Sequence, residues 1–188
     1  MASIEIHSIQ TVSGNQPRMR RLAEAAGDTY LAGTPLALNA AGFVIPWAGA
    51  IVTNQVGAII GTSKEFGANL ATAGVAQQQT FGSVPNQSAA VNISRPYFND
   101  GLTGVEVADP DTIFLAQVGP AQTAVQALIG TQLGMTKDAD NHWFVDTTKT
   151  TVGTNTCVIV VKLDPNDQSA TPRGVYVRFV VGSVQPVA

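Results

Sequence analysis

Residues 29–46, TYLAGTPLALNAAGFVIP, indicate the fold class of this 188-residue chain, because they have the pattern of a β-hairpin. Residues 35–38 and 43–45 are short apolar runs, and between them stand Asn39 and Gly42, two residue types that tolerate turn conformations. No catalytic side chain occurs in this stretch. Short apolar runs, frequent glycine and few reactive groups continue to the end of the chain. The pattern favours a protein whose function is to present a surface.

The same pattern predicts further strands along the chain. They are expected at residues 56–61, 105–107, 112–118, 142–146, 156–163 and 175–181. In the last run Val175, Val177 and Phe179 should face the core, with Arg178 on the opposite side. In residues 156–163 the core face is expected to be that of Cys157, a buried and inert thiol. Val158 and Val160 then lie on the other face and need a separate cover.

The fold class is therefore expected to be mainly β, with one or two small β-barrel or β-sandwich domains and at most one or two short helices. Residues 1–28 should hold an N-terminal arm and a short helix, which would cover residues 17–26 and end at Gly27. Residues 29–118 should form a β-rich domain. Residues 119–188 should form a C-terminal β-barrel-like domain, with a single helical turn before Gly130.

Composition limits the partners of the chain. Charged residues make up 12% of it, about half of the usual roughly 25%. The net charge of −3 argues against nucleic acid as a partner, because the neutralisation of phosphates needs a basic face. No apolar run approaches the roughly 18 to 20 residues that cross a bilayer, so no membrane partner is expected. A chain with so few charges is expected to bury part of its surface against other subunits.

Candidate contact residues occur near the N-terminus. Apolar residues of the first segment suit an edge strand, but they lie outside the hairpin and could form an arm that reaches a neighbouring subunit. The basic cluster that follows would place Arg18 and Arg21 on one face of the expected helix, either in solvent or against an acidic partner. The candidate capsid or subunit contacts are Ile4, Ile6, Ile9, Val12, Arg18, Arg20 and Arg21.

The residues that could carry chemistry have structural explanations. His142 lies near Asp140 and Asp146, but a histidine at a strand edge beside solvated carboxylates accounts for that spacing. Residues 138–141, DADN, lack the glycine and the distal glutamate of a calcium loop and indicate a hairpin turn. No phosphate-binding glycine loop, nucleophile elbow or zinc-ligand spacing occurs in the sequence. We therefore expect no enzymatic activity, metal or cofactor.

Several short motifs resemble capsid decoration (cement) proteins of tailed double-stranded DNA bacteriophages. Residues 32–44, AGTPLALNAAGFV, are similar to the Gly-Thr-Pro-Val, aliphatic, Gly opening of that family. Shorter matches are IIG at 59–61, NIS at 92–94, FNDG at 98–101, TIF at 112–114, WFVD at 143–146 and GVYVRF at 174–179. The motifs span most of residues 29–182.

The resemblance implies a structural virion protein that binds the outside of the assembled, expanded capsid and stabilises it. Its partners would be the lattice of the major capsid protein and further copies of the chain in a homotrimer. It would be located on the capsid surface of the virion, and in the host cytoplasm during assembly. The family has no active site whose residues could be transferred to this chain.

Two alternatives remain open. A carbohydrate- or receptor-binding β-sandwich would require Trp47, Trp143 or tyrosines on one exposed patch. Nothing in the spacing of the two tryptophans places them on one surface, and both are expected in the core or in a subunit contact. A hydrolase would require His7 or His142 beside a nucleophile in a pocket.

Overall fold

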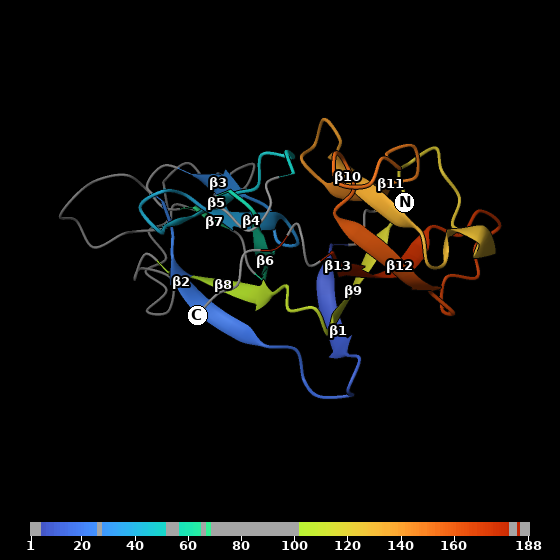
Figure 1. Ribbon diagram of the computed structural model, residues 1–188, viewed down its shortest axis with the longest axis horizontal. Coiled ribbons are helices and arrows are strands. Elements are labelled where there is room, and N and C mark those ends of the chain that lie inside the picture. Colours follow the sequence, from blue (N-terminus) through green and yellow to red (C-terminus); the bar gives the residue numbers. More distant parts are fainter. Residues whose placement is uncertain are drawn as a thin grey trace, which may run out of the picture.

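The computed structural model describes residues 5–25, 28–51, 57–64, 67–68, 102–180 and 184. In these residues the chain forms two antiparallel sheets and one small two-stranded sheet, which confirms the prediction of a mainly β fold. Figure 1 shows the five-stranded sheet on the left and the six-stranded sheet on the right. The described strands do not close into a barrel, and the arrangement is that of a small β-sandwich. Among the described residues, no helix has the length and apolar character needed to cross a membrane.

The six-stranded sheet has the order β1-β9-β13-β12-β10-β11 and is antiparallel at every pairing. Its strands are β1 (His7–Thr11), β9 (Thr112–Gln117), β10 (Gln132–Lys137), β11 (Trp143–Asp146), β12 (Val158–Leu163) and β13 (Gly174–Phe179). One parallel bridge joins Val118, just after β9, to Val145 of β11. The last strand of the sheet therefore curls back toward β9.

Burial in β12 and β13 tests the predicted strand faces. Val177 and Phe179 of β13 are buried and Arg178 is exposed, as predicted. In β12 the prediction is wrong, because Val158 and Val160 belong to the core while Ile159 is half-buried. Cys157 is also buried, but it lies before the start of β12, so the alternation of the strand does not extend to it. The Val158 face consequently needs no cover from another subunit.

The five-stranded sheet has the order β2-β8-β6-β4-β5. Its strands are β2 (Met19–Ala23), β8 (Leu102–Val107), β6 (Ile59–Ser63), β4 (Pro35–Leu38) and β5 (Val44–Pro46), and β3 (Thr29–Tyr30) pairs separately with β7 (Gly67–Ala68). The predicted β4–β5 hairpin is confirmed. The Asn39 side-chain oxygen accepts hydrogen bonds from the N–H groups of Ala41 and Phe43, both at 3.0 Å. Gly42 has a φ of 81°, which glycine adopts without strain.

The two large sheets share one core. Ala37 and Ile59 of the five-stranded sheet belong to the same buried cluster as Phe114 and Val177 of the six-stranded sheet. A second, smaller cluster lies on the other face of the five-stranded sheet and contains Tyr30, Leu36, Val44, Ile60 and Val105. Neighbouring residues along β4 and β6 thus enter different clusters, so this sheet is buried on both faces.

The sheets do not follow the predicted division of the chain. β1 and β9 both precede residue 119, yet they pair within the sheet that holds the C-terminal strands. β8 and β9 are adjacent in sequence but enter different sheets. The single helical turn predicted before Gly130 is present as the 3₁₀ turn η1 (Gln126–Leu128). Gly130 follows it with a φ of 81°.

The predicted structure of the N-terminal segment is wrong in two respects. Residues 19–23 form a strand and not a helix, and β2 pairs with β8 from Met19 opposite Glu106 to Ala23 opposite Leu102. A short segment has weak helical preference of its own, and pairing with a sheet overrides it. The segment before it is no free arm, because β1 pairs with β9. The other sequence interpretation, an edge strand, is correct.

Candidate functional site

The predicted apolar contact residues do not form one surface. Ile6 is 2% exposed and belongs to the shared core. Ile9 and Val12 are 38% and 60% exposed. Ile9 lies where the register between β1 and β9 shifts, a bulge that alters the direction of side chains. Only Ile9 and Val12 therefore remain as described surface candidates, and Ile4 lies outside the described residues.

The three predicted arginines lie at the outer strand of the five-stranded sheet. Arg20 and Arg21 are consecutive residues of β2, so they point to opposite faces. Arg18 precedes the strand and lies 3.9 Å from the Asp109 carboxylate. The Arg21 guanidinium donates a hydrogen bond of 3.1 Å to the Leu102 carbonyl. The predicted shared face of Arg18 and Arg21 is thus replaced by an alternating arrangement along a strand.

A basic depression of about 250 Å³ adjoins this strand. Arg20, Arg21 and Lys64 line it, together with Met19 and Gly104. Sequence reasoning missed Lys64, which follows β6 and reaches the site because β6 and β2 both flank β8. We call the three cations of this depression, together with Arg18 just before β2, the basic edge.

A buried carboxylate lies next to the basic edge. Glu106 is 2% exposed, and its Oε1 atom is 3.0 Å from the Lys64 ammonium. Its Oε2 atom accepts a hydrogen bond of 2.5 Å from the Ser8 N–H and one of 3.4 Å from the Thr62 hydroxyl. The Ser8 bond links β1 of one sheet to β8 of the other. The sequence offers no signal for this role, because a glutamate between two valines is typical of a solvent-facing strand position.

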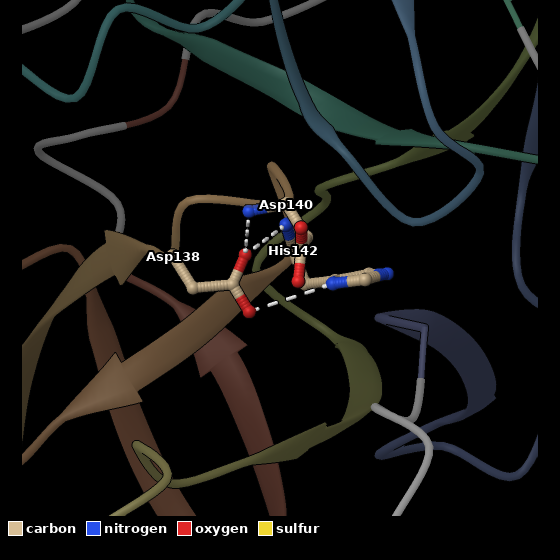
Figure 2. A group of neighbouring side chains, drawn as sticks. All are labelled: Asp138, Asp140 and His142. Atoms are coloured by element: carbon tan, nitrogen blue, oxygen red, sulfur yellow. Dashed lines mark hydrogen bonds and ion pairs between the residues drawn. The ribbon is translucent and has the colours of Figure 1, made fainter.

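Asp138, Asp140 and His142 come together at the turn between β10 and β11 (Figure 2). One possible ligand atom from each lies within 4.8 Å of the others. Asp138 Oδ1 accepts the N–H groups of Asp140 and His142, both at 2.9 Å, and Oδ2 lies 3.4 Å from His142 Nδ1. Partial desolvation opposes ionisation, but these N–H groups hold the pKa of Asp138 below its usual value. The geometry is that of the predicted hairpin turn, with Asn141 at a φ of 67°.

The other residues considered for chemistry have structural roles. Asp146 accepts hydrogen bonds from Gln122 and from the backbone and hydroxyl of Thr148. Among the described residues, no hydrogen bond or ion pair joins Asp146 to His142, which pairs with Asp138 instead. Burial raises the pKa of the Cys157 thiol to about 12, so this cysteine is protonated at neutral pH and unreactive, as predicted.

The two tryptophans pack against each other. Trp47 follows β5 and Trp143 begins β11, and their ring centroids are 5.1 Å apart with an angle of 34° between the planes. They are 4% and 7% exposed, which confirms the prediction of core tryptophans. The exposed aromatic patch that the carbohydrate-binding alternative required is therefore not formed by these two rings. The Trp47 indole N–H donates to the Ala50 carbonyl at 2.9 Å and fixes the ring.

A cleft of about 330 Å³ adjoins the tryptophan pair. Aromatic rings and polar side chains of both sheets line it, including Tyr30, Trp47, Trp143, Lys137, Asp140 and Asn141. Sequence reasoning missed the cleft, because about a hundred residues separate its two sides. No family model matches the chain, and no curated protein or solved structure shows significant similarity to it.

Proposed function

We propose that the chain is a structural virion protein, which binds the outside of an assembled phage capsid and stabilises it. The observation that supports this function best is the basic edge, where Arg20 and Arg21 of β2, Arg18 just before it and Lys64 after β6 supply four cations at one side of the five-stranded sheet. The resemblance of residues 32–44 to capsid decoration proteins supports the same function. A protein that binds the assembled shell, and not the free subunits, shifts the equilibrium toward the shell.

The basic edge suits an acidic partner surface. Arg18 is half-exposed and Met19 is 53% exposed, so both charge and apolar contact are available at this strand. Cations that face a complementary surface steer association and determine its orientation more than they add affinity. Because a capsid repeats the same surface many times, such modest contacts occupy many equivalent positions.

The proposal includes a homotrimer on the capsid surface, with the protein present in the host cytoplasm during assembly. From the sequence, the face of β12 that carries Val158 was expected to need cover from another subunit. In the structure this face is part of the core. Support for self-association therefore comes from the low charge of the chain and from the resemblance. No catalytic step, cofactor or nucleic acid takes part in the proposed function.

Co-sedimentation with emptied, expanded capsids tests this function. The Arg18→Ala, Arg20→Ala, Arg21→Ala triple variant should bind capsids more weakly than the wild type. The difference should shrink as salt is raised, because exposed charges are screened within about 10 Å at 0.1 M salt. The matched control replaces Lys137, Lys162 and Arg178, three exposed cations of the six-stranded sheet, with alanine.

The control variant loses the same charge and should bind as the wild type does. Unfolding curves of both variants establish that each is folded before binding is compared. Equal weakening in the two variants would remove the basic edge from the proposal. A wild-type protein that stays in the supernatant at low salt would overturn the capsid function itself.

A further inference from the structure

Three side chains with metal-binding groups meet at the hairpin between β10 and β11, which the proposed capsid function does not use. Asp138 follows β10, Asp140 lies in the turn and His142 precedes β11. The Asp138 N–H donates a hydrogen bond of 3.0 Å to the His142 carbonyl, so the two residues lie opposite each other. Their side chains therefore leave the hairpin on the same face. Figure 2 shows the Asp140 carboxylate beside them.

We propose that Asp138, Asp140 and His142 bind a divalent transition-metal ion of the zinc class. The donors are two carboxylate oxygens and one imidazole nitrogen. Imidazole is a good ligand for Zn²⁺, Cu²⁺ and Ni²⁺, whereas Ca²⁺ and Mg²⁺ are bound through oxygen. The imidazole therefore makes this site different in kind from a group of acidic residues. Three protein ligands leave the remaining coordination position of the ion to water.

The spacing of the donor atoms fits a single ion. Asp138 Oδ2 and His142 Nδ1 are 3.4 Å apart. Bonds of about 2.1 Å to a tetrahedral zinc ion place two ligand atoms about 3.4 Å apart, so an ion can contact both atoms where they stand. A ligand atom of Asp140 lies within 4.8 Å of the other two, and rotation of this exposed side chain brings it into reach. Sequence reasoning missed the site, because this spacing of ligands matches no zinc motif.

Hydrogen bonds of the turn orient the Asp138 carboxylate before an ion binds. Its Oδ1 atom accepts the N–H groups of Asp140 and His142, both at 2.9 Å, so Oδ2 is the oxygen that remains for an ion. Metal-bound carboxylates commonly have such outer hydrogen bonds, which hold the ligand in position. Coordination through Nδ1 requires the neutral imidazole with its proton on Nε2. The ion then takes the place of the direct contact between His142 and Asp138.

The site is negatively charged and open to solvent. The side chains of Asp138 and His142 are 29% and 40% exposed, and Asp140 is exposed, so an ion can enter without opening the fold. Two ionised carboxylates this close repel each other, and a divalent cation between them removes the repulsion. Lys137, at the end of β10, contacts the Asn141 side-chain oxygen at 3.4 Å. Among the described residues it forms no ion pair with either aspartate, so both carboxylates remain available to an ion.

Titration calorimetry with zinc chloride tests the site. The full chain is used without a histidine tag, because a tag would itself bind the ion. One Zn²⁺ per chain should bind with a Kd below about 1 mM. Calcium chloride and magnesium chloride at the same concentrations should give no saturable heat. Electron paramagnetic resonance with Cu²⁺ gives a second readout, in which the signal should show splitting from one imidazole nitrogen.

Two pairs of variants locate the binding. His142→Gln should weaken Zn²⁺ binding by at least about tenfold, since even the loss of an outer partner costs about 10- to 100-fold, and it should abolish the nitrogen splitting. His7→Gln changes the other histidine of the chain and should bind as the wild type does. Asp140→Asn should also weaken binding, and it leaves the turn intact, because among the described residues no hydrogen bond involves the Asp140 carboxylate. Asp111→Asn, at an exposed aspartate on another turn, is its matched control.

Three results would overturn the site. One is the lack of saturable Zn²⁺ binding up to about 1 mM free ion. Another is binding that His142→Gln and Asp140→Asn leave unchanged, or that the two control variants weaken equally. The third is equal binding of Ca²⁺, which would mean that the imidazole takes no part. Unfolding curves establish that each variant is folded, and Asp140→Asn decides the matter if His142→Gln is not. Because capsid binding is measured separately through the basic edge, this inference and the proposed function fail independently.

Discussion

The two sheets share a core, but they are stabilised by different kinds of contact. The six-stranded sheet buries apolar side chains such as Phe114, Val177 and Phe179, and its β13 alternates between core and surface. The five-stranded sheet is buried on both faces, and its interior also holds Glu106 and Thr62. Where a strand is buried on both faces, as β6 and β8 are, its polar residues lie inside, and a buried polar group needs a hydrogen-bond partner.

The polar contacts of the five-stranded sheet join particular segments. Glu106 accepts the Ser8 N–H of β1, and Glu24 accepts a hydrogen bond from the Tyr30 hydroxyl. Apolar contacts are non-directional and tolerate several packings, whereas a buried carboxylate is satisfied in few arrangements. The five-stranded sheet therefore depends more than the six-stranded sheet on buried polar contacts.

Among the changes considered, the deletion of residues 2–16 should lower the free energy of unfolding the most. The deletion removes β1, the hydrogen bond to Glu106 and the buried Ile6, so both sheets lose contacts. We expect the free energy of unfolding to fall by at least about 5 kcal/mol, from the core side chain and the strand hydrogen bonds together. Denaturant unfolding measures it. Ile6→Ala should reproduce a large part of the loss and Val12→Ala almost none. An unchanged unfolding midpoint in the deletion variant would mean that residues 2–16 form a free arm after all.

Truncation of Phe179 tests the apolar side of the comparison. Its ring packs edge-on against Phe114, with centroids 5.1 Å apart, and it is fully buried. Phe179→Ala should lower the free energy of unfolding by about 3 to 5 kcal/mol. Arg178→Ala, at the neighbouring exposed position, should cost less than about 0.5 kcal/mol. The reverse order in urea unfolding would mean that the faces of β13 are assigned incorrectly.

Neutralisation of Glu106 tests the polar side. Glu106→Gln keeps the shape of the side chain but turns the ion pair with Lys64 into a weaker contact. We expect a loss of about 1 to 3 kcal/mol, the range for a disturbed buried polar group. Glu5→Gln, a change of an exposed glutamate in the same chain, is the control and should be near neutral. If the two variants are equally stable, the buried Glu106 carboxylate does not stabilise the fold.

Acid should weaken the six-stranded sheet through Asp167. The backbone N–H of Arg173, with the Ser169 hydroxyl and the Gly174 N–H, lowers the pKa of Asp167 to about 2. The usual value is about 3.9, so the folded state favours the ionised form. The stabilisation is present above about pH 4 and is lost as the pH falls toward 2. Asp167→Asn should flatten the decline of unfolding free energy in that window, and a slope equal to the wild type would contradict this.

Local patterns in the sequence were sufficient for the β4–β5 hairpin and for the position and buried face of β13. Asn39 and Gly42 mark the turn between β4 and β5, and the alternation from Val175 to Phe179 marks the buried face of β13. The turn at residues 138–141 was equally evident, because Asp138 and Asn141 are turn residues by their own chemistry. Each of these features depends on side chains close in sequence.

The sequence by itself determined the fold class, the β4–β5 and β10–β11 turns and the alternation of β13 between core and solvent. Only the tertiary structure decided that residues 19–23 form a strand, that β1 and β9 join the C-terminal strands, and that Glu106 is buried. The contact between Trp47 and Trp143, and the cleft beside it, likewise join residues of the two sheets. The physical reason is that strand pairing and burial join residues far apart in the chain, and no local pattern records which partner a strand will find.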